Sequence, residues 1–412
     1  MAGHGGEAPG RVNAPIYLDY QATAPLAPEA AAAMRPWLGE RFANPHSSHR
    51  PGREAAAAVE VARDRILNAL QIRSSRAKSR GARDESVPAP LDFARDERSQ
   101  GTLYFTSGAT EAANWALKGA AARLPANRRR IVTLATEHAC VLDTVEWLGR
   151  QGFEVDVLPV RPDGVVDLAS LDARVDERTG IVAAMLVNNE IGIIQPVAEI
   201  GALARSRGAL FFCDAVQGFG RVSVPLDGCD MVALSAHKVH GPKGIGALWV
   251  RDGTPLDPLL HGGGQEGGLR SGTLSPALCA GFGEAARLLV EHAEEDRAHV
   301  EALWEAARAA LPGWTLNGAA DPRYHGNLNI RRESIDSTRL ISEVRGVAFS
   351  AGSACASGSG RPSHVLAALG LSKREARSSI RLGFGRTTSE AELLRALASI
   401  DAAAGRQLSF AA

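Results

Sequence analysis

Short apolar runs separated by helix-length polar segments make up the middle of this chain. The runs that we interpret as strands are Leu103–Phe105, Ile131–Leu134, Val155–Leu158, Ile181–Val187, Leu210–Cys213, Met231–Leu234 and the neighbourhood of Trp249. Polar segments long enough for helices lie at residues 141–151 and 197–207. Strands that alternate with helices along a chain are typical of βαβ units. The sequence therefore predicts an α/β fold, with a mostly parallel sheet flanked by helices.

The segments on either side of this middle part predict two domains. Residues 276–310 are rich in Ala, Glu and Arg and are expected to form one long helix. That helix leads into a smaller α+β domain over residues 276–412, after a large domain over residues 16–275. Residues 1–15 are rich in Gly, Ala and Pro, which predicts a disordered tail. An alanine-rich helix is expected over residues 54–71.

Residues 73–100 interrupt the pattern between this helix and the first strand. Five of the 11 residues from Arg73 to Arg83 are basic and none is acidic, and Pro88 and Pro90 follow. The few apolar residues here do not offset the entropy lost when such a segment is ordered by itself. We expect a polar surface insertion, and a basic docking surface for an acidic partner or RNA is the alternative.

Composition and charge argue against several classes of function. The 46 acidic residues balance the 46 basic residues, so no overall charge favours a nucleic acid or a membrane surface. No apolar run approaches the roughly 18 residues that cross a bilayer. The five cysteines lack the CxxC spacing and are few for 412 residues. This pattern favours a reducing cytoplasm over a disulfide framework.

A lysine follows one of the predicted strands, in the tetrapeptide Ser235-Ala236-His237-Lys238. A glycine-rich stretch comes next, at residues 241–246. A lysine in this position can hold pyridoxal phosphate as a Schiff base, while Ser235 and His237 donate hydrogen bonds to the phosphate. A solvated loop lysine is the alternative.

Polar residues at the ends of other predicted strands can complete such a site. Asp214 can pair with the pyridine nitrogen of the cofactor, and Gln217 can hydrogen-bond its phenolic oxygen. His138 can stack on the ring and move protons, and Asn189 can contact the phenolic oxygen or a substrate carboxylate. An ordinary capping or helix-start residue is the alternative for Asp214 and His138. Because ligands bind where the strands of open α/β sheets end, the shared position of these residues favours one binding site.

Two further segments have compositions that suit a ligand. Thr106–Glu111 follows a strand and opens a helix, so its free N–H groups and the hydroxyl of Thr110 suit a phosphate. An ordinary helix cap is the alternative there. His261–Thr273 is dense in glycine, which predicts either a flexible loop or a backbone that closely approaches a ligand or another subunit.

One cysteine lies among small residues, in Gly352-Ser353-Ala354-Cys355. It belongs to no apolar period, so we expect it to be exposed, and an exposed thiol favours a nucleophile over a chance surface cysteine. The other cysteines lie in or beside apolar segments and are predicted to be small core residues: Cys140, Cys213, Cys229 and Cys279.

A series of motifs occurs in an order that resembles one enzyme family. The motifs are Tyr17–Tyr20, Asn44-Pro45 with Ser48-His49, Thr106–Glu111, Thr136–His138, Val187–Gly192, His237-Lys238, Gly241–Gly246, His261–Thr273, Gly352–Cys355 and Ser379–Arg381. Together they resemble the cysteine desulfurases, which are pyridoxal phosphate (PLP) enzymes of fold type I in the class V aminotransferase family, over residues 16–405. The roomy segment around Cys355 resembles group I, which serves general iron–sulfur assembly and nitrogenase maturation.

The resemblance implies a role for each matching residue. The implied cofactor contacts are Ala109, Thr110, His138, Asn189, Asp214, Gln217, Ser235, His237 and Lys238, with Thr273 from the other protomer of a homodimer. Lys238, His138 and Cys355 are the implied catalytic residues. Asn189 and Arg381 are the implied substrate contacts, and the guanidinium of Arg381 would clamp the carboxylate of L-cysteine.

The implied activity is the removal of sulfur from L-cysteine, which gives L-alanine and a persulfide on Cys355. An iron–sulfur scaffold or another acceptor protein would take this sulfur. No metal site is expected beyond a transient iron–sulfur ligand role for Cys355. A selenocysteine lyase, a class V aminotransferase and a non-catalytic partner-binding protein on the same fold are the alternatives. Gln21 and Ala24 depart from the small or hydroxyl residues that are more usual in the first motif.

Overall fold

The largest feature of the computed structural model, which describes residues 14–79, 101–351 and 363–411, is a seven-stranded sheet. In chain order its strands are β2 (Gly101–Thr106), β3 (Arg130–Leu134), β4 (Glu154–Leu158), β5 (Thr179–Met185), β6 (Leu210–Asp214), β7 (Met231–Ser235) and β8 (Gly246–Arg251). Their order across the sheet is β2-β8-β7-β6-β5-β3-β4. The strands from β7 to β4 run parallel, whereas β8 is antiparallel to both of its neighbours. The predicted α/β fold with a mostly parallel sheet is confirmed.

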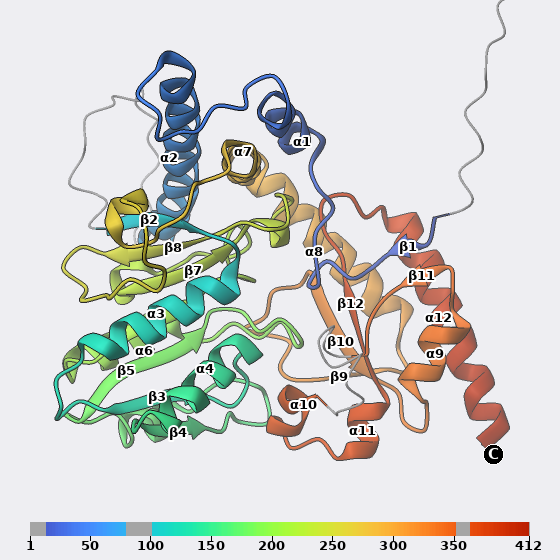
Figure 1. Cartoon of the computed structure of the whole chain (residues 1–412). Helices are drawn as coiled ribbons and strands as arrows, with labels where there is room; N and C mark the ends of the chain where they lie inside the picture. Colours follow the sequence, from blue (N-terminus) through green and yellow to red (C-terminus); the bar gives the residue numbers. More distant parts are fainter. Residues whose placement is uncertain (1–13, 80–100, 352–362, 412) are drawn as a thin grey trace, which may run out of the picture.

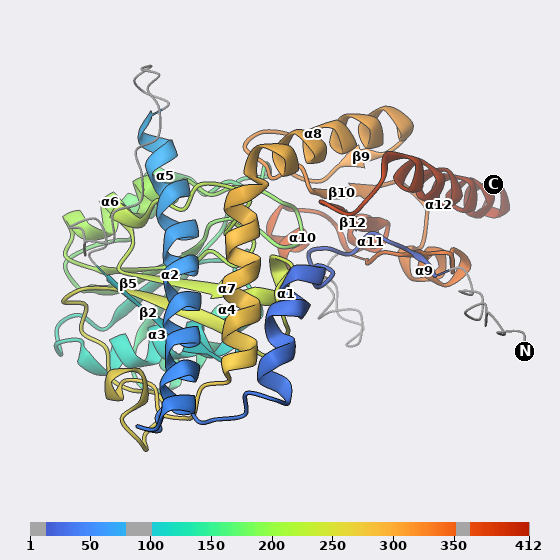
Figure 2. The ribbon, with the colours of Figure 1, turned by 90° about the horizontal axis from the view of Figure 1, so that it is seen from above.

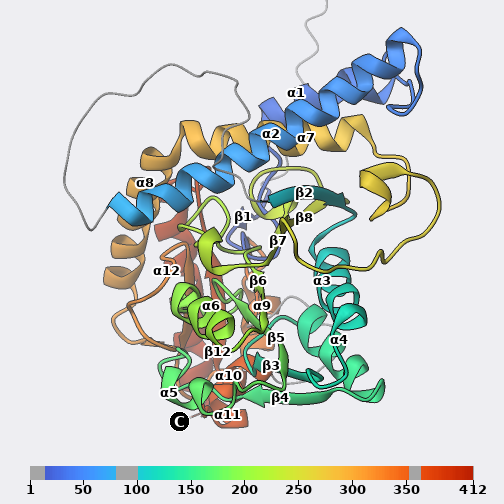
Figure 3. The same cartoon turned by 90° about the vertical axis from the view of Figure 1, so that its left-hand side faces the viewer.

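Helices cover both faces of this sheet (Figure 1). One face packs against α2 (Arg50–Ser79), α6 (Val197–Ser206) and α7 (Pro276–Glu291), and the other against α3 (Ala109–Arg123) and α4 (Ala139–Arg150). Successive side chains of a strand point to opposite faces, so Ile131 joins one core and Val132 joins the other. Two layers of helix thus enclose the sheet (Figure 3), and apolar side chains fill both of its faces.

A smaller group of elements packs beside the large sheet. It contains the antiparallel strands β9 (Thr315–Leu316), β10 (Asn327–Arg331) and β12 (Ser379–Gly383), with the helices α8 (Ala293–Ala310), α9 (Ser337–Glu343) and α12 (Glu390–Ala411). Its core is separate and includes Trp304, Ile330 and Leu397. The N-terminal strand β1 (Ile16–Tyr17) pairs in parallel with β11 (Val347–Ala348), so the start of the described chain joins this smaller group.

Several short elements connect these layers. They are α1 (Pro28–Met34), α5 (Leu168–Asp172), α10 (His364–Ala368), α11 (Lys373–Arg377) and the 3₁₀ helices η1 (Arg35–Leu38), η2 (Leu226–Gly228), η3 (Ala236–Lys238) and η4 (Gln265–Gly268). Among the helices of the described residues, none combines the length and the apolar character that a membrane crossing requires.

Two predicted helices have different bounds in the structure. The single helix expected over residues 276–310 is wrong, because the backbone leaves the helical region at His292 (φ −99°, ψ 17°) and separates α7 from α8. Three acidic residues follow the break, which suits the positive end of a new helix. The helix expected over residues 54–71 extends as α2 through Ser79, which is well into the segment that was predicted to interrupt the pattern.

The break at His292 changes which layer each half of this stretch joins. α7 packs against α1 and α2 and lies beside α2 above the large sheet (Figure 2), whereas α8 packs against α12.

Of the predicted features, residues 1–13 of the tail, residues 80–100 of the insertion and Cys355 lie outside the described residues. The predicted domain boundary at residue 276 stays a prediction.

Candidate active site

Most of the predicted cofactor residues gather at one edge of the large sheet. Asp214 is the last residue of β6, and Ser235 is the last residue of β7, followed at once by η3 with Lys238. Asn189 lies in the turn after β5, and His138 caps the start of α4 just after β3. The strands β7, β6, β5 and β3 are neighbours and run parallel, so their carboxyl ends meet at the same edge.

The side chain of Lys238 is held by the N-terminal segment. Its Nζ donates hydrogen bonds to the carbonyl oxygens of Gln21 (2.6 Å) and Ala22 (2.8 Å). Nε2 of Gln217 donates to the same Gln21 carbonyl, at 2.9 Å. The segment that follows β1 therefore forms one wall of the site. The local sequence shows none of this, because Gln21 and Lys238 are 217 residues apart.

His138 and Asp214 influence each other's titration. Burial lowers the pKa of His138, and although Asp214 raises it, the net pKa lies below the usual value. Burial raises the pKa of Asp214, and His138 and the Val216 N–H, 3.0 Å from Oδ1, offset this only in part. The Cys140 N–H donates to Nδ1 of His138 (3.1 Å), so the neutral ring carries its proton on Nε2. A neutral imidazole suits ring stacking and proton transfer, and a cationic ring nitrogen would stabilise the charged form of Asp214.

Several groups beside Lys238 suit a phosphate. The Oγ of Ser235 is buried and has no hydrogen-bond partner among the described residues. Ser235 pairs with Gly246 across the sheet, where an added Cβ would stand only 2.8 Å from the Cα of Gly108, the residue before α3. The first N–H groups of α3, at Ala109 and Thr110, have no partner within the helix. An unpaired buried hydroxyl close to free N–H groups at a helix start fits the phosphate of PLP.

An ion pair ties the start of α3 to the glycine-dense loop. Arg270 donates to both carboxylate oxygens of Glu111, at 2.8 and 3.1 Å, and the Ser107 N–H donates at 2.7 Å. Burial alone would raise the pKa of Glu111, but these hydrogen bonds bring it below its usual value. The loop continues to Thr273, which is exposed. Among the described residues of this one chain no hydrogen bond joins Thr273 to the other predicted site residues, and its role in the site of a second protomer stays a prediction.

His237 contacts the same N-terminal segment as Lys238. Its Nδ1 lies 3.2 Å from Oγ1 of Thr23, and its carbonyl accepts the N–H of Ala24 at 2.8 Å. Burial and the nearby charge of Lys238 lower the pKa of His237 to about 4. The ring is therefore a neutral hydrogen-bonding group near pH 7.

Arg381 reaches the site from the smaller group of elements. It lies in the middle of β12, opposite Asn329, and its side chain is 1% exposed. Nη2 pairs with Oδ1 of Asp19 at 2.7 Å, and Nη1 donates to the Asn189 carbonyl at 3.0 Å. Its Nε is buried without a partner among the described residues. The contact with Asn189 brings this arginine to the turn that follows β5.

The sequence reasoning missed Arg221. Its Nη1 donates to Oε1 of Gln217, and its Nη2 donates to the Lys238 carbonyl at 2.8 Å. Its guanidinium carbon lies 5.1 Å from the ring centroid of Tyr324. Arg221 thereby orients the Gln217 amide so that Nε2, a donor, faces Gln21. Its position four residues after Gln217 is the one local signal that could have drawn attention to it.

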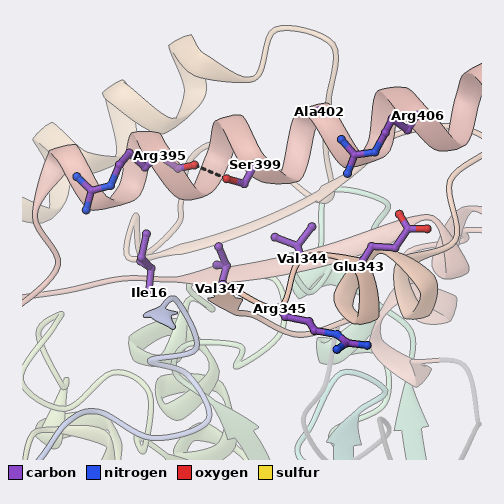
Figure 4. Close-up of a pocket in the computed structure, with 10 residues that line it drawn as sticks. Ile16, Glu343, Val344, Arg345, Val347, Arg395, Ser399, Ala402 and Arg406 are labelled. Atoms are coloured by element: carbon purple, nitrogen blue, oxygen red, sulfur yellow. Dashed lines mark hydrogen bonds between the residues drawn. The ribbon is translucent and has the colours of Figure 1, made fainter. Parts of the chain in front are cut away.

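A groove of about 580 Å³ lies elsewhere, between α12 and the segment that joins α9 to β11 (Figure 4). Arg345, Arg395 and Arg406 are among the residues that line it. None of the predicted site residues belongs to its lining. The groove is therefore separate from the candidate active site.

Comparisons with known proteins point to one family. The family model for aminotransferase class-V matches residues 96–395. A cysteine desulfurase IscS of Rickettsia bellii is 42% identical over 388 residues, which are 92% of this chain and 88% of the relative. A solved NifS-like protein has a TM-score of 0.82 and 32% identity, with 96% of this chain and 100% of that chain covered. A structure of SspA in complex with cysteine has a TM-score of 0.73 and 34% identity, with 89% and 98% covered.

The family model covers well over half of the chain, and the curated relative covers nearly all of it. The resemblance read from the motifs is thereby confirmed. This chain belongs to the class V aminotransferases and, among them, to the cysteine desulfurases.

Proposed function

We propose that this chain is a pyridoxal-phosphate-dependent cysteine desulfurase that converts L-cysteine to L-alanine and keeps the sulfur as a persulfide. The observation that carries the proposal is Lys238, which follows β7 beside Asp214 and is held by the carbonyls of Gln21 and Ala22. When bound, PLP supplies an electron sink for bond cleavage at the substrate's α-carbon. The relatives named as cysteine desulfurases and the cysteine-bound SspA structure support L-cysteine as the substrate.

The residues of the sheet edge would hold the cofactor. Asp214 would pair with its ring nitrogen, and His138 would cover the ring. Gln217 and Asn189 would contact its phenolic oxygen. The phosphate contacts would be Ala109, Thr110, Ser235 and His237, with Thr273 from a second protomer. The orphaned Oγ of Ser235 supports this assignment, since a buried hydroxyl without a partner is costly.

Three side chains would act on the substrate. Lys238, once released from the two carbonyls, takes the α-proton, and Arg381 binds the carboxylate. The thiolate of Cys355, which lies outside the described residues, attacks the substrate's sulfur. An S–S bond to Cys355 then forms as the C–S bond of the substrate breaks, and L-alanine leaves after protonation.

The enzyme would work as a homodimer and pass its sulfur to another protein. The apolar side chains of Leu38 and Phe42 are 71% and 88% exposed, which supports contact with a second subunit. An iron–sulfur scaffold or another acceptor protein would take the persulfide sulfur. A reducing cytoplasm is the proposed location, and the free thiols of four buried cysteines support it.

The two enzymatic alternatives are not favoured. A selenocysteine lyase would use the same site residues, but the named relatives are desulfurases. An aminotransferase would not need Cys355. Loss of sulfide release in the variant Cys355→Ser would distinguish the desulfurase from the aminotransferase.

The experiment measures alanine and sulfide released from L-cysteine in the presence of a thiol reductant, with the wild type beside Cys355→Ser. We expect the variant to bind PLP normally and to release no sulfide, because it has no thiolate to accept sulfur. Cys279→Ser is the matched control, since Cys279 is buried in the core, and it should keep its activity. Equal sulfide release by the wild type and Cys355→Ser would refute the persulfide mechanism.

A further inference from the structure

Arg381 carries its charge where water is almost excluded. Its side chain is 1% exposed, and a buried cation without a counter-ion strongly destabilises a fold. The carboxylate of Asp19 supplies the counter-charge, 2.7 Å from Nη2. These two residues are 362 positions apart in the chain, so the pair exists because β1 and the turn after it lie against β12.

Asp19 is itself held in place by contacts that do not involve the guanidinium of Arg381. The main chain of Asp19 forms a β-bridge with Gly383, and its main-chain carbonyl accepts a hydrogen bond from the hydroxyl of Tyr17 at 3.1 Å. The Oγ of Ser350 donates to the same Oδ1, at 3.2 Å. Asp19 is therefore a rigid anchor for whatever pairs with it.

The guanidinium retains donors after these contacts are made. Arginine has five N–H groups in one plane. Nη2 uses one on Asp19 and Nη1 uses one on the Asn189 carbonyl, while Nε is buried without a partner among the described residues. A planar group held at two points cannot turn freely, so its remaining donors keep a fixed direction.

We propose that Asp19 is a positioning residue for the substrate carboxylate, because it holds the guanidinium of Arg381 in place while leaving other N–H groups of that guanidinium to the amino acid. The inference rests on the proposed function, in which Arg381 binds the carboxylate. Asp19 acts through Arg381 and does not touch the substrate. If Asp19 instead competed with the substrate for Arg381, its removal would strengthen substrate binding, which is the opposite sign.

The test uses the full-length, PLP-loaded enzyme and the variants Asp19→Ala and Asp19→Asn. Binding is followed as the change in cofactor absorbance on titration with L-alanine or with L-alaninamide, which lacks the carboxylate. We expect Asp19→Ala to weaken L-alanine binding roughly tenfold and L-alaninamide binding by no more than about twofold. Asp19→Asn keeps an oxygen acceptor without the charge, so it should fall between. The KM for L-cysteine should rise with the dissociation constant for L-alanine, more than kcat falls.

A second ion pair of the same region provides the matched control. Asp296 accepts from Nη2 and Nε of Arg386 at 2.6 and 2.8 Å, and both side chains are about one-fifth exposed. Asp296→Ala removes an arginine–carboxylate pair without touching Arg381, so both ligands should bind as they do to the wild type. Melting temperatures and cofactor content show whether each variant is folded, and Asp19→Asn carries the test if Asp19→Ala is not.

Two results would overturn the inference. Equal weakening of L-alanine and L-alaninamide would mean that Asp19 has only a structural role, and tighter binding of L-alanine would mean that it competes with the substrate. Failure of the proposed function would look different, since the wild type would then release no sulfide from L-cysteine. The ratio of the dissociation constants for L-alanine and L-alaninamide tests the role of Asp19 independently of sulfide release.

Discussion

Two cations of the candidate site, Lys238 and Arg381, are held in opposite ways. Lys238 stands just after a strand of the large sheet, is partly exposed, and is held by two neutral main-chain carbonyls. Arg381 stands in the middle of a strand of the small sheet, is 1% exposed, and is paired with a carboxylate. One cation occupies the open edge of a parallel sheet, and the other is built into a core.

This difference matches the two tasks that we propose. A lysine that bonds to a cofactor and later moves a proton must leave its resting contacts, and the hydrogen bonds from Nζ to the Gln21 and Ala22 carbonyls are single bonds that can be exchanged for others. An arginine that recognises a carboxylate is more useful when it does not move, because a preorganised fork loses less entropy on binding. If these proposed roles hold, the large sheet carries the reacting lysine and the small sheet provides a fixed point for the substrate.

The largest effect is expected for a substitution of Lys238, the partly exposed cation of the two. Lys238→Ala should lower sulfide release by roughly a thousandfold or more, because it removes both the covalent link to the cofactor and the proposed base. Borohydride reduction should attach the cofactor to the wild type and not to the variant, as mass spectrometry would show. Lys243, an exposed lysine five residues further on, provides the control Lys243→Ala, which should be labelled normally. Labelling of Lys238→Ala would contradict the assignment.

A smaller and more selective effect is expected at the buried cation. Arg381→Lys keeps the charge but loses the planar fork that pairs with Asp19 and the Asn189 carbonyl together. The KM for L-cysteine should rise roughly tenfold or more, and cofactor absorbance and content should stay as in the wild type. Arg386→Lys is the control. If Arg381→Lys also lost the cofactor, Arg381 would contribute to cofactor binding. The proposed division of roles between Lys238 in the large sheet and Arg381 in the small sheet would then be wrong.

The smallest effect is expected for His240, which lies in the loop that follows Lys238. It concerns how the folding stability of the protein depends on pH. Burial lowers the pKa of His240 from 6.5 to about 4, and its Nδ1 lies 2.9 Å from the Pro25 carbonyl. The unfolded chain thus binds this proton at a higher pH than the folded chain does, so stability is present above pH 6.5 and is lost as the pH falls towards 4.

The variant His240→Asn removes this titration and tolerates the left-handed backbone at that position (φ 65°). The melting temperature of the wild type should fall by a few degrees more than that of the variant between pH 6.5 and pH 4. Calorimetry at a series of pH values checks this. Parallel pH curves for the two proteins would show that His240 does not contribute.

The local sequence predicted the large sheet well because its strands are buried on both faces. A parallel strand between two helical layers appears as a continuous apolar run, and runs such as Ile131–Leu134 and Leu210–Cys213 coincide with β3 and β6 to within one residue. The antiparallel direction of β8 and the order of the strands were not predictable in this way. The pattern of apolar residues indicates which residues are buried, but it does not indicate which strands pair with one another.

The break at His292 shows the limit of helix prediction. Residues 276–310 favour a helix throughout, and the sequence shows only the acidic residues that open α8. The chain turns there because α7 packs on α1 and α2 while α8 packs on α12. Packing in two different places therefore overrode the local preference for one helix.

The sequence by itself determined the family and the residue types of the site, because Lys238, His138 and Arg381 lie in motifs that are visible locally and Asp214 directly follows an apolar run. Only the tertiary structure decided which partners hold them. The contacts of Asp19 with Arg381 and of Gln21 with Lys238 join positions 362 and 217 residues apart. Such contacts depend on strand pairing and on the packing of two sheets. The periodicity of a single segment cannot predict these long-range contacts, because each partner considered alone looks like an ordinary polar residue.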